Sequence, residues 1–428
     1  MSLSSSLNAG VSGLATNSSR LATISDNISN SSTFGYKKVE TEFHSLVIAG
    51  TYTAGGVRST VERNVDAKGT LISTGNATDL AVAGRGFLPV ASRTDVVSGG
   101  DFQMQMTSTG SFKLDQNGYL RSPSDLLLLG WPADADGTIP QLPRSSDSGL
   151  EPIQVNLNAV SGEPTTAMTL AVNLPATETE AGASGAAQEM LLEYYDNLGA
   201  SQSITATFTP SVPGAGQSNE WTVELYDSAS AAVVGDYTLT FDDSRTDGGT
   251  LASVVTNAGG AYDPATGSVI VTVDGGPIEI TFGQIGDPVG MTQLGDRFAP
   301  VNLDKDGAPV GNMLSLEVDS AGYVYALYDS GITRTIYQVP LVDVPNVNGL
   351  MALNNQSFIP SSDSGDFFLW DAGTGPTGEM VPFAREESTT DVAEELTSMI
   401  QTQRAYSSNA KVIQTVDEML QETTNIKR

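Results

Sequence analysis

Apolar residues repeat every seven positions near the N-terminal end of the chain. Leu7, Leu14, Leu21 and Ile28 follow this interval. An α-helix completes one turn in about 3.6 residues, so the repeat places these side chains along one narrow stripe. Most other positions are Ser, Asn, Thr, Ala or Gly, which, Ala excepted, are weak helix formers. The pattern predicts a helix that becomes ordered when a partner covers its stripe.

The C-terminal end carries the same kind of repeat. Its apolar residues at seven-residue intervals are Val392, Met399, Tyr406, Ile413 and Leu420. Acidic residues crowd the start of this segment and basic residues end it, as the helix macrodipole favours. Ser388, Thr390 and Asp391 are the candidate capping residues. The sequence therefore predicts a second long helix.

Two matching stripes indicate that the chain ends pair as a coiled coil. At about 1.5 Å per residue the helices are roughly 40 and 50 Å long, and they bury only part of their apolar surface against each other. Two interpretations stay open: the pair closes a single molecule, or its uncovered residues contact copies of the same chain. The second predicts a polymerisation interface formed by Leu7, Leu14, Leu21, Ile28, Val392, Leu396, Met399, Tyr406, Ile413 and Leu420.

Between the two helical segments the apolar period changes to two. Such alternation indicates short strands, and the turn signals between them have the spacing of a β-sandwich or barrel. The clearest segments are 204–208, 221–226, 237–241, 269–273 and 278–282. Two further segments, Asp115–Leu120 (DQNGYL) and Asp319–Val324 (DSAGYV), place a glycine turn before an aromatic residue. Both predict β-hairpins.

These patterns predict a mainly β fold with terminal α-helices and nested domains. The chain is expected to pass from a helix through a shared β domain into an inserted one, and then back. The two β domains are expected to be sandwich-like or barrel-like. The predicted parts are 1–32 with 388–428 as a helical polymerisation domain, 33–75 as a linker region, 76–145 with 286–387 as a shared β domain, and 146–285 as an inserted outer β domain.

Charge and composition exclude several classes of protein. The formal net charge is −30, and the segment 151–290 contains 18 Asp or Glu but only one basic residue, Arg245. A basic nucleic-acid surface is therefore not expected. The acidic segment fits a solvated surface that keeps particles apart, and a generic acidic surface fits equally well. The absence of cysteine excludes disulfides and thiol chemistry.

The first twenty residues lack the basic start and the apolar run of a secretory signal, and no stretch reaches the roughly 18 apolar residues of a membrane span. We therefore expect neither signal cleavage nor membrane insertion. The only histidine is His44, so the common triads and zinc sites are hard to assemble. The stretches 134–137 and 304–307 lack the Gly and Glu of a calcium loop and are interpreted as turns. We expect no catalytic residue, cofactor or metal; carboxylate-based hydrolysis is the remaining enzymatic alternative.

Several motifs resemble those of flagellar rod and hook proteins. The segment 24–38 (ISDNISNSSTFGYKK) is similar to the one that closes the N-terminal helix in that family, and 80–90 and 109–120 resemble its first β motifs. The segment 401–413 (QTQRAYSSNAKVI) resembles its C-terminal motif. The motif positions carried over to this chain are Asn27, Asn30, Gly35, Tyr36, Arg404, Ala405, Asn409 and Ala410.

The resemblance implies a structural function. The acidic insert favours a hook protein, whose subunits form a flexible hollow tube that transmits torque from rod to filament. Implied partners are the chain itself, the flagellar rod, the hook cap, the hook–filament junction proteins and the type III export apparatus. The implied location is the extracellular hook, reached without a cleaved signal. A distal rod protein and a secreted β-rich adhesin are the competing interpretations.

Overall fold

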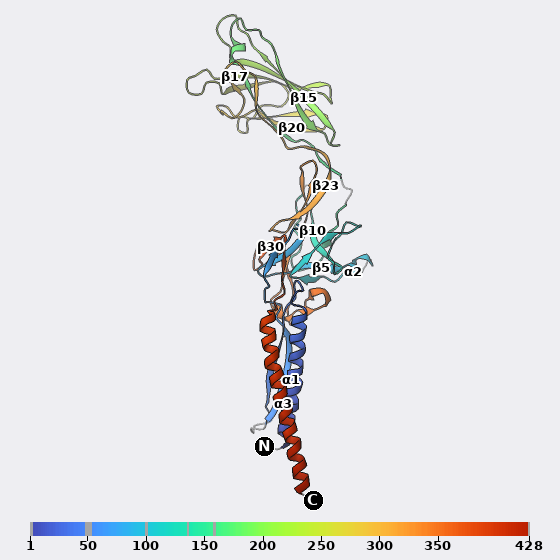
Figure 1. The fold of residues 1–428 in the computed structure, drawn as a ribbon. Helices are drawn as coiled ribbons and strands as arrows, with labels where there is room; N and C mark the ends of the chain where they lie inside the picture. The colour runs from blue at the N-terminus through green and yellow to red at the C-terminus, as the bar shows by residue number, and fades with distance from the viewer. Residues whose placement is uncertain (1–2, 48–53, 99–101, 135–136, 157–159, 427–428) are drawn as a thin grey trace. The chain divides into compact units, whose positions relative to one another are not determined.

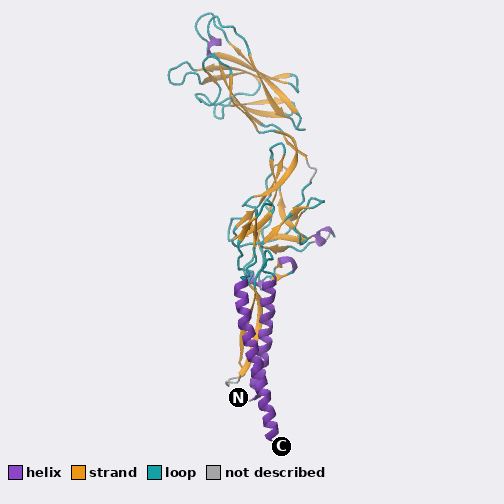
Figure 2. Ribbon diagram, viewed as in Figure 1, coloured by secondary structure: helices purple, strands orange, loops and turns teal. Residues whose placement is uncertain are grey.

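A computed structural model of the chain describes residues 3–47, 54–98, 102–134, 137–156 and 160–426. Two long helices, α1 (Leu3–Ser29) and α3 (Val392–Ile426), lie at the chain ends, and strands dominate the segment between them (Figures 1 and 2). This confirms the predicted fold class. The chain divides into two compact units: unit 1 contains 1–157, 316–326 and 334–428, and unit 2 contains 158–315 and 327–333.

Unit 1 holds both helices and several small sheets. A hairpin of β1 (Val39–Val47) and β2 (Ala54–Arg63) follows α1. Two small sheets use strands from early and from late in the sequence. These strands are β3 (Leu71–Ser73), β4 (Asp79–Ala83), β7 (Thr109–Ser111), β30 (Glu379–Pro382) and β31 (Ala384–Glu386). β3 pairs with β31, and β4 lies between β30 and β7. Each of these two sheets therefore joins strands from both ends of the sequence.

The core of unit 1 lies on a larger set of strands. Their order includes β25-β10-β5-β6-β28-β27. The bounds are β5 (Leu88–Ser92), β6 (Gln105–Thr107), β10 (Leu126–Pro132), β25 (Thr333–Gln338), β27 (Met351–Ala352) and β28 (Phe358–Ile359). Buried Phe87, Leu129, Trp131, Val342 and Phe358 form the centre of this core. Smaller elements of the unit are α2 (Arg93–Val97), β8 (Lys113–Leu114), β9 (Leu120–Arg121), β11 (Glu151–Pro152), β26 (Leu341–Asp343), η2 (Val347–Gly349), η3 (Asn354–Gln356) and β29 (Phe368–Trp370).

Both predicted glycine hairpins are confirmed, and they share one turn chemistry. The carboxylate of Asp115 accepts hydrogen bonds from the backbone N–H groups of Asn117 and Tyr119, at 2.9 Å each, between β8 and β9. Asp319 does the same between β23 (Ala308–Val318) and β24 (Tyr323–Tyr328). Gly118 and Gly322 follow with φ of 81° and 86°, a backbone region that favours glycine. The Asp side chain thus replaces backbone bonds that a tight turn cannot make.

Unit 2 contains two sheets that enclose one core. The first has the order β14-β15-β16-β17-β18, and the second has the order β19-β20-β13-β21 with β22 on the other side of β13. The strand bounds are β12 (Val160–Glu163), β13 (Ala167–Leu174), β14 (Gln188–Tyr195), β15 (Ser201–Pro210), β16 (Glu220–Asp227), β17 (Ala232–Phe241), β18 (Leu251–Ala258), β19 (Ser268–Val273), β20 (Gly276–Thr281), β21 (Thr292–Gln293) and β22 (Ala299–Lys305), and η1 (Ala176–Thr179) is a single turn. All five segments predicted from the two-residue period lie on these strands.

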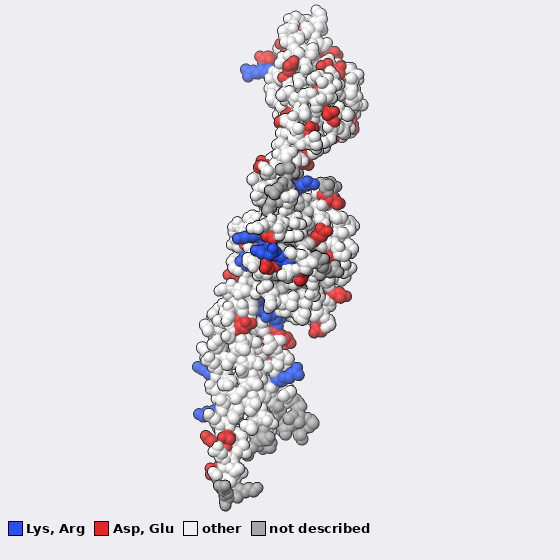
Figure 3. All heavy atoms as spheres, turned by 90° about the vertical axis from the view of Figure 1, so that its right-hand side faces the viewer, with Lys and Arg blue, Asp and Glu red and all other residues white. Residues whose placement is uncertain are grey.

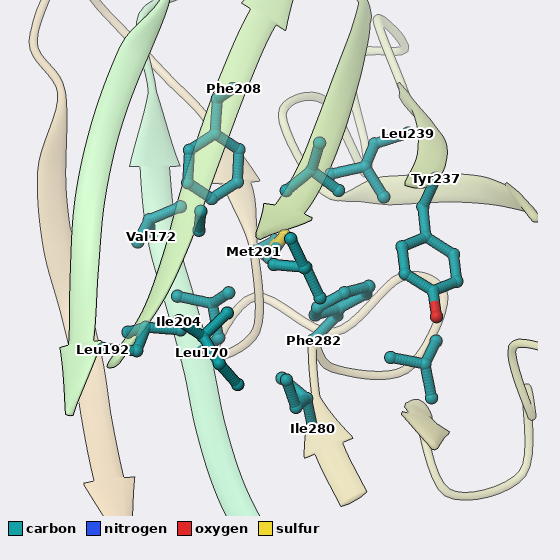
Figure 4. Close-up of a cluster of buried hydrophobic side chains, with 14 of the residues drawn as sticks. Leu170, Val172, Leu192, Ile204, Phe208, Tyr237, Leu239, Ile280, Phe282 and Met291 are labelled. Carbon is teal, nitrogen blue, oxygen red and sulfur yellow. The ribbon is translucent and has the colours of Figure 1, made fainter. Parts of the chain in front are cut away.

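Alternate residues of both sheets meet in the core of unit 2. Figure 4 shows Phe208, Leu239 and Tyr237 opposite Val172, Ile280 and Phe282. The rings of Tyr237 and Phe282 are 5.5 Å apart at 79°, an edge-to-face contact. β21 and β22 pair with β13, so the structure places them in unit 2, although their residues lie in the range predicted for the shared domain. The four-part division by residue number stays a prediction.

Truncation of the Phe282 side chain tests this core. Phe282→Ala removes a fully buried ring, and we expect a loss of about 3–5 kcal/mol in the free energy of unfolding. Ile270→Ala is the matched control, because Ile270 is 56% exposed on β19 and its loss should cost less than about 0.5 kcal/mol. Denaturant unfolding of both variants measures the difference. Equal losses would mean that the ring does not contribute to a packed core.

Candidate assembly interface

Helices α1 and α3 lie side by side in unit 1 (Figure 1), and small residues form their closest contact. A Cβ atom at Gly13 would lie 2.8 Å from the side-chain nitrogen of Asn409, and one at Gly10 would lie 3.0 Å from Cγ1 of Ile413. Both distances are too short for an ordinary contact. The helix backbones therefore approach each other more closely than larger residues would permit.

The buried positions of the two helices are mostly polar. They are Gly10, Gly13, Thr16, Asn17, Ile24 and Asn27 on α1, and Glu395, Thr402 and Val416 on α3. Three of the polar side chains bond to a carbonyl of their own helix: Thr16 to Ser12 at 2.8 Å, Asn17 to Gly13 at 2.7 Å, and Thr402 to Ser398 at 2.7 Å. These three buried polar side chains therefore find their hydrogen-bond partners within their own helix and need none on the other helix.

The apolar stripes are only partly used within the chain. Leu7, Leu14, Leu21, Ile28, Met399 and Ile413 are half-buried. The exposed members are Val392, Leu396, Tyr406 and Leu420, with exposed fractions of 39%, 47%, 40% and 39%. On α3 the stripe borders the buried face, whose fully buried positions at seven-residue spacing are Glu395, Thr402 and Val416. The helices pair as predicted, but mainly through small and polar residues.

The β1–β2 hairpin covers another side of α1. The N–H of Val57 donates to Oγ of Ser12 at 3.1 Å, and the hydroxyls of Thr23 and Thr41 are 2.9 Å apart. This hairpin lies within the expected linker region, 33–75, for which no strand was predicted. Its signal was present in the alternation of Val39, Thr41 and Phe43, a pattern typical of a strand.

Asn27 connects α1 to the strand that follows it. Its side-chain amide donates to the carbonyl of Val39 at 2.8 Å and accepts from the N–H of Val39 at 2.9 Å, as a neighbouring strand would. The hydroxyl of Tyr36 donates to Oδ1 of Asn27 at 3.1 Å and to Asp26 at 3.0 Å. Burial, together with the neighbouring Asp26 carboxylate, raises the pKa of Tyr36 to about 12. This network fixes the direction in which the chain leaves the helix.

The same junction holds the entrance to α3. Gly35, at φ 72°, donates its N–H to the carbonyl of Glu386 at 2.8 Å. Lys37 forms an ion pair of 2.6 Å with the carboxylate of Glu386, and both side chains are buried. The N–H of Lys38 donates to the Thr389 hydroxyl at 2.8 Å. These contacts join segments that lie about 350 residues apart in the sequence.

The structure places the motif residues in two groups. Asn27, Gly35 and Tyr36 lie together at the junction, while Asn30 bonds locally to Asp26. On α3, Asn409 and Ala410 are half-buried, and Arg404 and Ala405 are exposed. The first group therefore acts within the chain. Within the described residues, Arg404 and Ala405 make no contact that would explain their place in the motif.

Other residues singled out in the sequence have ordinary structural surroundings. His44 is exposed and lies 2.9 Å from the Thr60 hydroxyl. Asp391, rather than Ser388 or Thr390, caps α3, since its carboxylate accepts from the N–H groups of Ala393 and Glu394. In the described parts of the chain, no three His, Cys, Asp or Glu side chains gather as a metal site would need. Among the same residues, no helix has both the length and the apolar character required to cross a bilayer.

A leucine at position 13 tests the close approach of the helices. In Gly13→Leu the new side chain should force α3 away from α1 and destabilise their contact by about 1–3 kcal/mol. The matched control is Ala15→Leu, which places the same residue on the exposed side of α1. Amide hydrogen exchange should show loss of protection along both helices in Gly13→Leu only. Equal protection in the two variants would contradict the small-residue contact.

The raised pKa of Tyr36 predicts a pH dependence of the junction. In an unfolded chain the pKa of a tyrosine is about 10. Because the folded pKa is about 12, the contribution of Tyr36 to stability should be complete below about pH 10 and should be lost as the pH rises towards 12. Across this range the wild-type protein should lose more stability than Tyr36→Phe. Tyr406→Phe, at an exposed position, should show the same dependence of stability on pH as the wild type. If Tyr36→Phe shows that dependence too, the ionisation of Tyr36 does not affect the stability of the junction.

Three family models match this chain. Residues 7–37 match "Flagella basal body rod protein", residues 156–308 match "Flagellar basal body protein FlaE D2 domain", and residues 384–426 match "Flagellar basal body rod FlgEFG protein C-terminal". The first match covers most of α1, the last contains α3, and the second covers most of unit 2.

Similar proteins extend over the whole chain. It is 33% identical to the flagellar hook protein FlgE of Rhizobium meliloti and 32% identical to that of Brucella suis, with 100% of both chains covered in each case. The hook protein FlgE of Salmonella typhimurium is 26% identical over 99% of this chain and 100% of its own. The crystal structure of Helicobacter pylori flagellar hook protein FlgE2 is 12% identical, covers 72% of this chain and 98% of its own, and has a TM-score of 0.46. On its full-length identity to the curated relatives, this chain belongs to the flagellar hook protein family.

Proposed function

We propose that this chain is the structural subunit of a bacterial flagellar hook and that it polymerises through α1 and α3 into a flexible hollow tube. The observation that carries the proposal is the exposed apolar stripe of α3. Val392, Leu396, Tyr406 and Leu420 remain accessible after α3 has paired with α1. An apolar stripe of this kind is typical of a surface that binds another protein.

A second copy of the chain is the best candidate to cover this stripe. Within one molecule, the helix contact is already satisfied by small residues and by hydrogen bonds inside each helix. The apolar side chains that remain include Val11 on α1 and Ile400, Val412 and Met419 on α3, each between 47% and 53% exposed. They lie on several sides of the helix pair, so one copy can contact more than one neighbour. Such repeated contacts produce a polymer rather than a closed dimer.

Unit 2 has a surface of a different kind. Many outward positions of its first sheet are polar, as at Thr205, Thr207 and Glu224, although Leu191 and Val255 of the same sheet are exposed apolar residues. Most of the charged side chains that Figure 3 shows on this unit are Asp or Glu. Contacts between such surfaces are hydrated and weak, so they can shift at small energetic cost. We infer that contacts between helices hold the tube together and that contacts between β units adjust as it bends.

The same proposal includes the partners and the location implied by the sequence. The subunit would be exported by the flagellar type III apparatus, would be added beneath the hook cap onto the rod, and would meet the hook–filament junction proteins at its other end. This role needs contact surfaces and no catalytic centre, so we propose that the chain acts without enzymatic activity. Its support is the family membership together with the exposed helix stripes.

Removal of two exposed side chains tests the polymerisation surface. In Leu396→Ser/Tyr406→Ser, each side chain lost from a contact between copies should weaken that contact by about 1.5–3 kcal/mol, which is tenfold or more in the critical concentration. The monomer should unfold as the wild type does, because both side chains are exposed. The matched control is Gln403→Ser, at an exposed polar position of the same helix.

Sedimentation of the purified polymers and electron microscopy of cells measure the outcome. We expect the double variant to leave cells with a rod but without a hook. Normal hooks in that strain would contradict the proposed surface. A strain that lacks the whole chain and also lacks the distal rod would indicate a rod protein instead.

A further inference from the structure

A small pocket in unit 1 is lined by polar groups and one cation. Its volume is about 100 Å³, and its lining includes Phe34, Ser111, Ser122, Gln356 and Arg385. These residues come from the turn after α1, from β7, from the turn before β10, from η3 and from β31. The pocket thus lies where five separate segments meet, next to the junction that Gly35 and Glu386 hold.

Arg385 is the only charged residue of the pocket lining, and it lacks an acceptor. Its guanidinium lies 3.8 Å from the centroid of the Phe34 ring. Among the described residues it forms no hydrogen bond, and its Nε atom is buried without a partner. The carboxylate that acts on it electrostatically, Asp79, already accepts hydrogen bonds of 2.6 Å from both Asn76 and Ser111. Burial lowers the pKa of Arg385, so the positive charge lies in a site from which water is partly excluded.

Gln356 is a second unused donor. No hydrogen bond is made by its side-chain amide within the described part of the chain. Its backbone has φ of 56° and follows Asn355 at φ 65°, two consecutive residues in a region that side chains rarely adopt. The amide of Asn355 donates to the carbonyl of Ser124 at 3.2 Å and anchors this turn. The strained turn therefore holds an unpaired amide at the pocket that contains the unpaired guanidinium.

The hydroxyls of Thr107, Thr109 and Ser111 in the lining have already used their hydrogen-bond donors. Thr107 donates to the carbonyl of Thr109 at 3.0 Å, and Thr109 donates to the carbonyl of Leu80 at 2.8 Å. Ser111 donates to Asp79. What remains for a ligand is a positive charge, amide N–H groups and the hydroxyl donors of Ser122 and Ser124, with no carboxylate in the lining. This combination suits an anion with planar oxygen acceptors, because a guanidinium and a carboxylate match in geometry.

We propose that this pocket accepts the carboxylate of an Asp or Glu side chain from a second copy of the chain, a contact that rests on the proposed function as a polymer subunit. The volume admits this ligand, because about 100 Å³ is well above the roughly 10–15 Å³ that a single water molecule needs by the same measure.

The charge balance favours a protein carboxylate over a free anion. The chain has 50 acidic and 20 basic residues, and its net charge of −30 repels small anions in solution. A polymer overcomes this repulsion, because contacts elsewhere on neighbouring copies hold the acidic side chain at a high effective concentration. Unit 2 is rich in suitable groups, since Arg245, Arg297 and Lys305 are its only basic residues. Basic side chains instead gather over the β part of unit 1 (Figure 3).

The substitution Gln356→Glu separates this contact from folding. The new side chain has the same size and places a carboxylate beside Arg385 within the same molecule. We expect the monomer to keep or raise its melting temperature, since the cation gains a partner. Assembly should weaken by at least tenfold in critical concentration, because the pocket is already occupied. Gln116→Glu is the matched control: Gln116 is exposed in unit 1, and the substitution changes the net charge equally without filling the pocket.

Photo-crosslinking identifies the occupant directly. A photoreactive phenylalanine analogue replaces Ser124, an exposed residue of the pocket lining, so that the space beside Arg385 stays open. The full chain with this analogue is incorporated into polymers that mix ¹⁴N-labelled and ¹⁵N-labelled subunits. We expect mass spectrometry to find crosslinks between differently labelled copies, on a peptide that contains an exposed Asp or Glu. Crosslinks to a different protein, or only within one copy, would overturn the inference, as would unchanged assembly of Gln356→Glu.

A comparison with wild-type protein keeps the two proposals apart. If the wild-type chain fails to polymerise at all, the proposed function fails. If it polymerises and neither Gln356→Glu nor the crosslinks behave as stated, only the carboxylate pocket fails. Inorganic phosphate added to wild-type monomers provides the last check: protection of Arg385 at millimolar phosphate in the monomer would assign the pocket to free anions rather than to a second copy.

Discussion

Gly10 and Gly13 allow α1 and α3 to approach so closely that their contact is made by small and polar side chains. That approach has a consequence for every other part of the helices. If leucines filled the contact, the apolar stripes would be consumed within one molecule. Because much of the contact uses Gly, Thr and Asn instead, Val392, Leu396, Tyr406 and Leu420 of α3 stay exposed. A chain that can close its own ends and still present an apolar surface is suited to polymerise.

The junction beside the helices determines how force can pass between them and the β part of unit 1. The buried pair of Lys37 and Glu386 ties the exit of α1 to the entrance of α3, and the amide of Asn27 holds α1 to β1. Breaking a buried ion pair by removing one partner typically costs about 3–5 kcal/mol, so the junction resists local opening. In the proposed tube, torque carried by the helices would reach the β part through this fixed point. The weaker, hydrated contacts of unit 2 would then be the ones that change as the tube bends.

Local patterns in the sequence predicted most elements of the fold. The helices follow from apolar repeats, the strands of unit 2 from alternation, and the hairpins at Asp115 and Asp319 from an Asp that bonds to its own turn. Each depends on neighbours in sequence. The face by which α1 meets α3 could not be predicted in this way, because Gly and Asn signal a contact only once their distance to another helix is known. The β1–β2 hairpin was missed for a related reason: its alternation at Val39 and Phe43 is short and was outweighed by the polar residues around it.

The candidate site was predictable to the same degree. Four exposed apolar residues of α3, Val392, Leu396, Tyr406 and Leu420, were predicted from the apolar pattern, whereas the exposed Ile400, Val412 and Met419 were not. The pocket at Arg385 joins five segments and has no pattern in any of them. A cryo-electron microscopy reconstruction of the polymer tests the central claim most directly. The account predicts that Val392, Leu396, Tyr406 and Leu420 become buried against other copies, while Gly13 remains against Asn409 of its own chain. A tube in which these four side chains stay exposed, or in which the α1–α3 contact is exchanged between molecules, would contradict it.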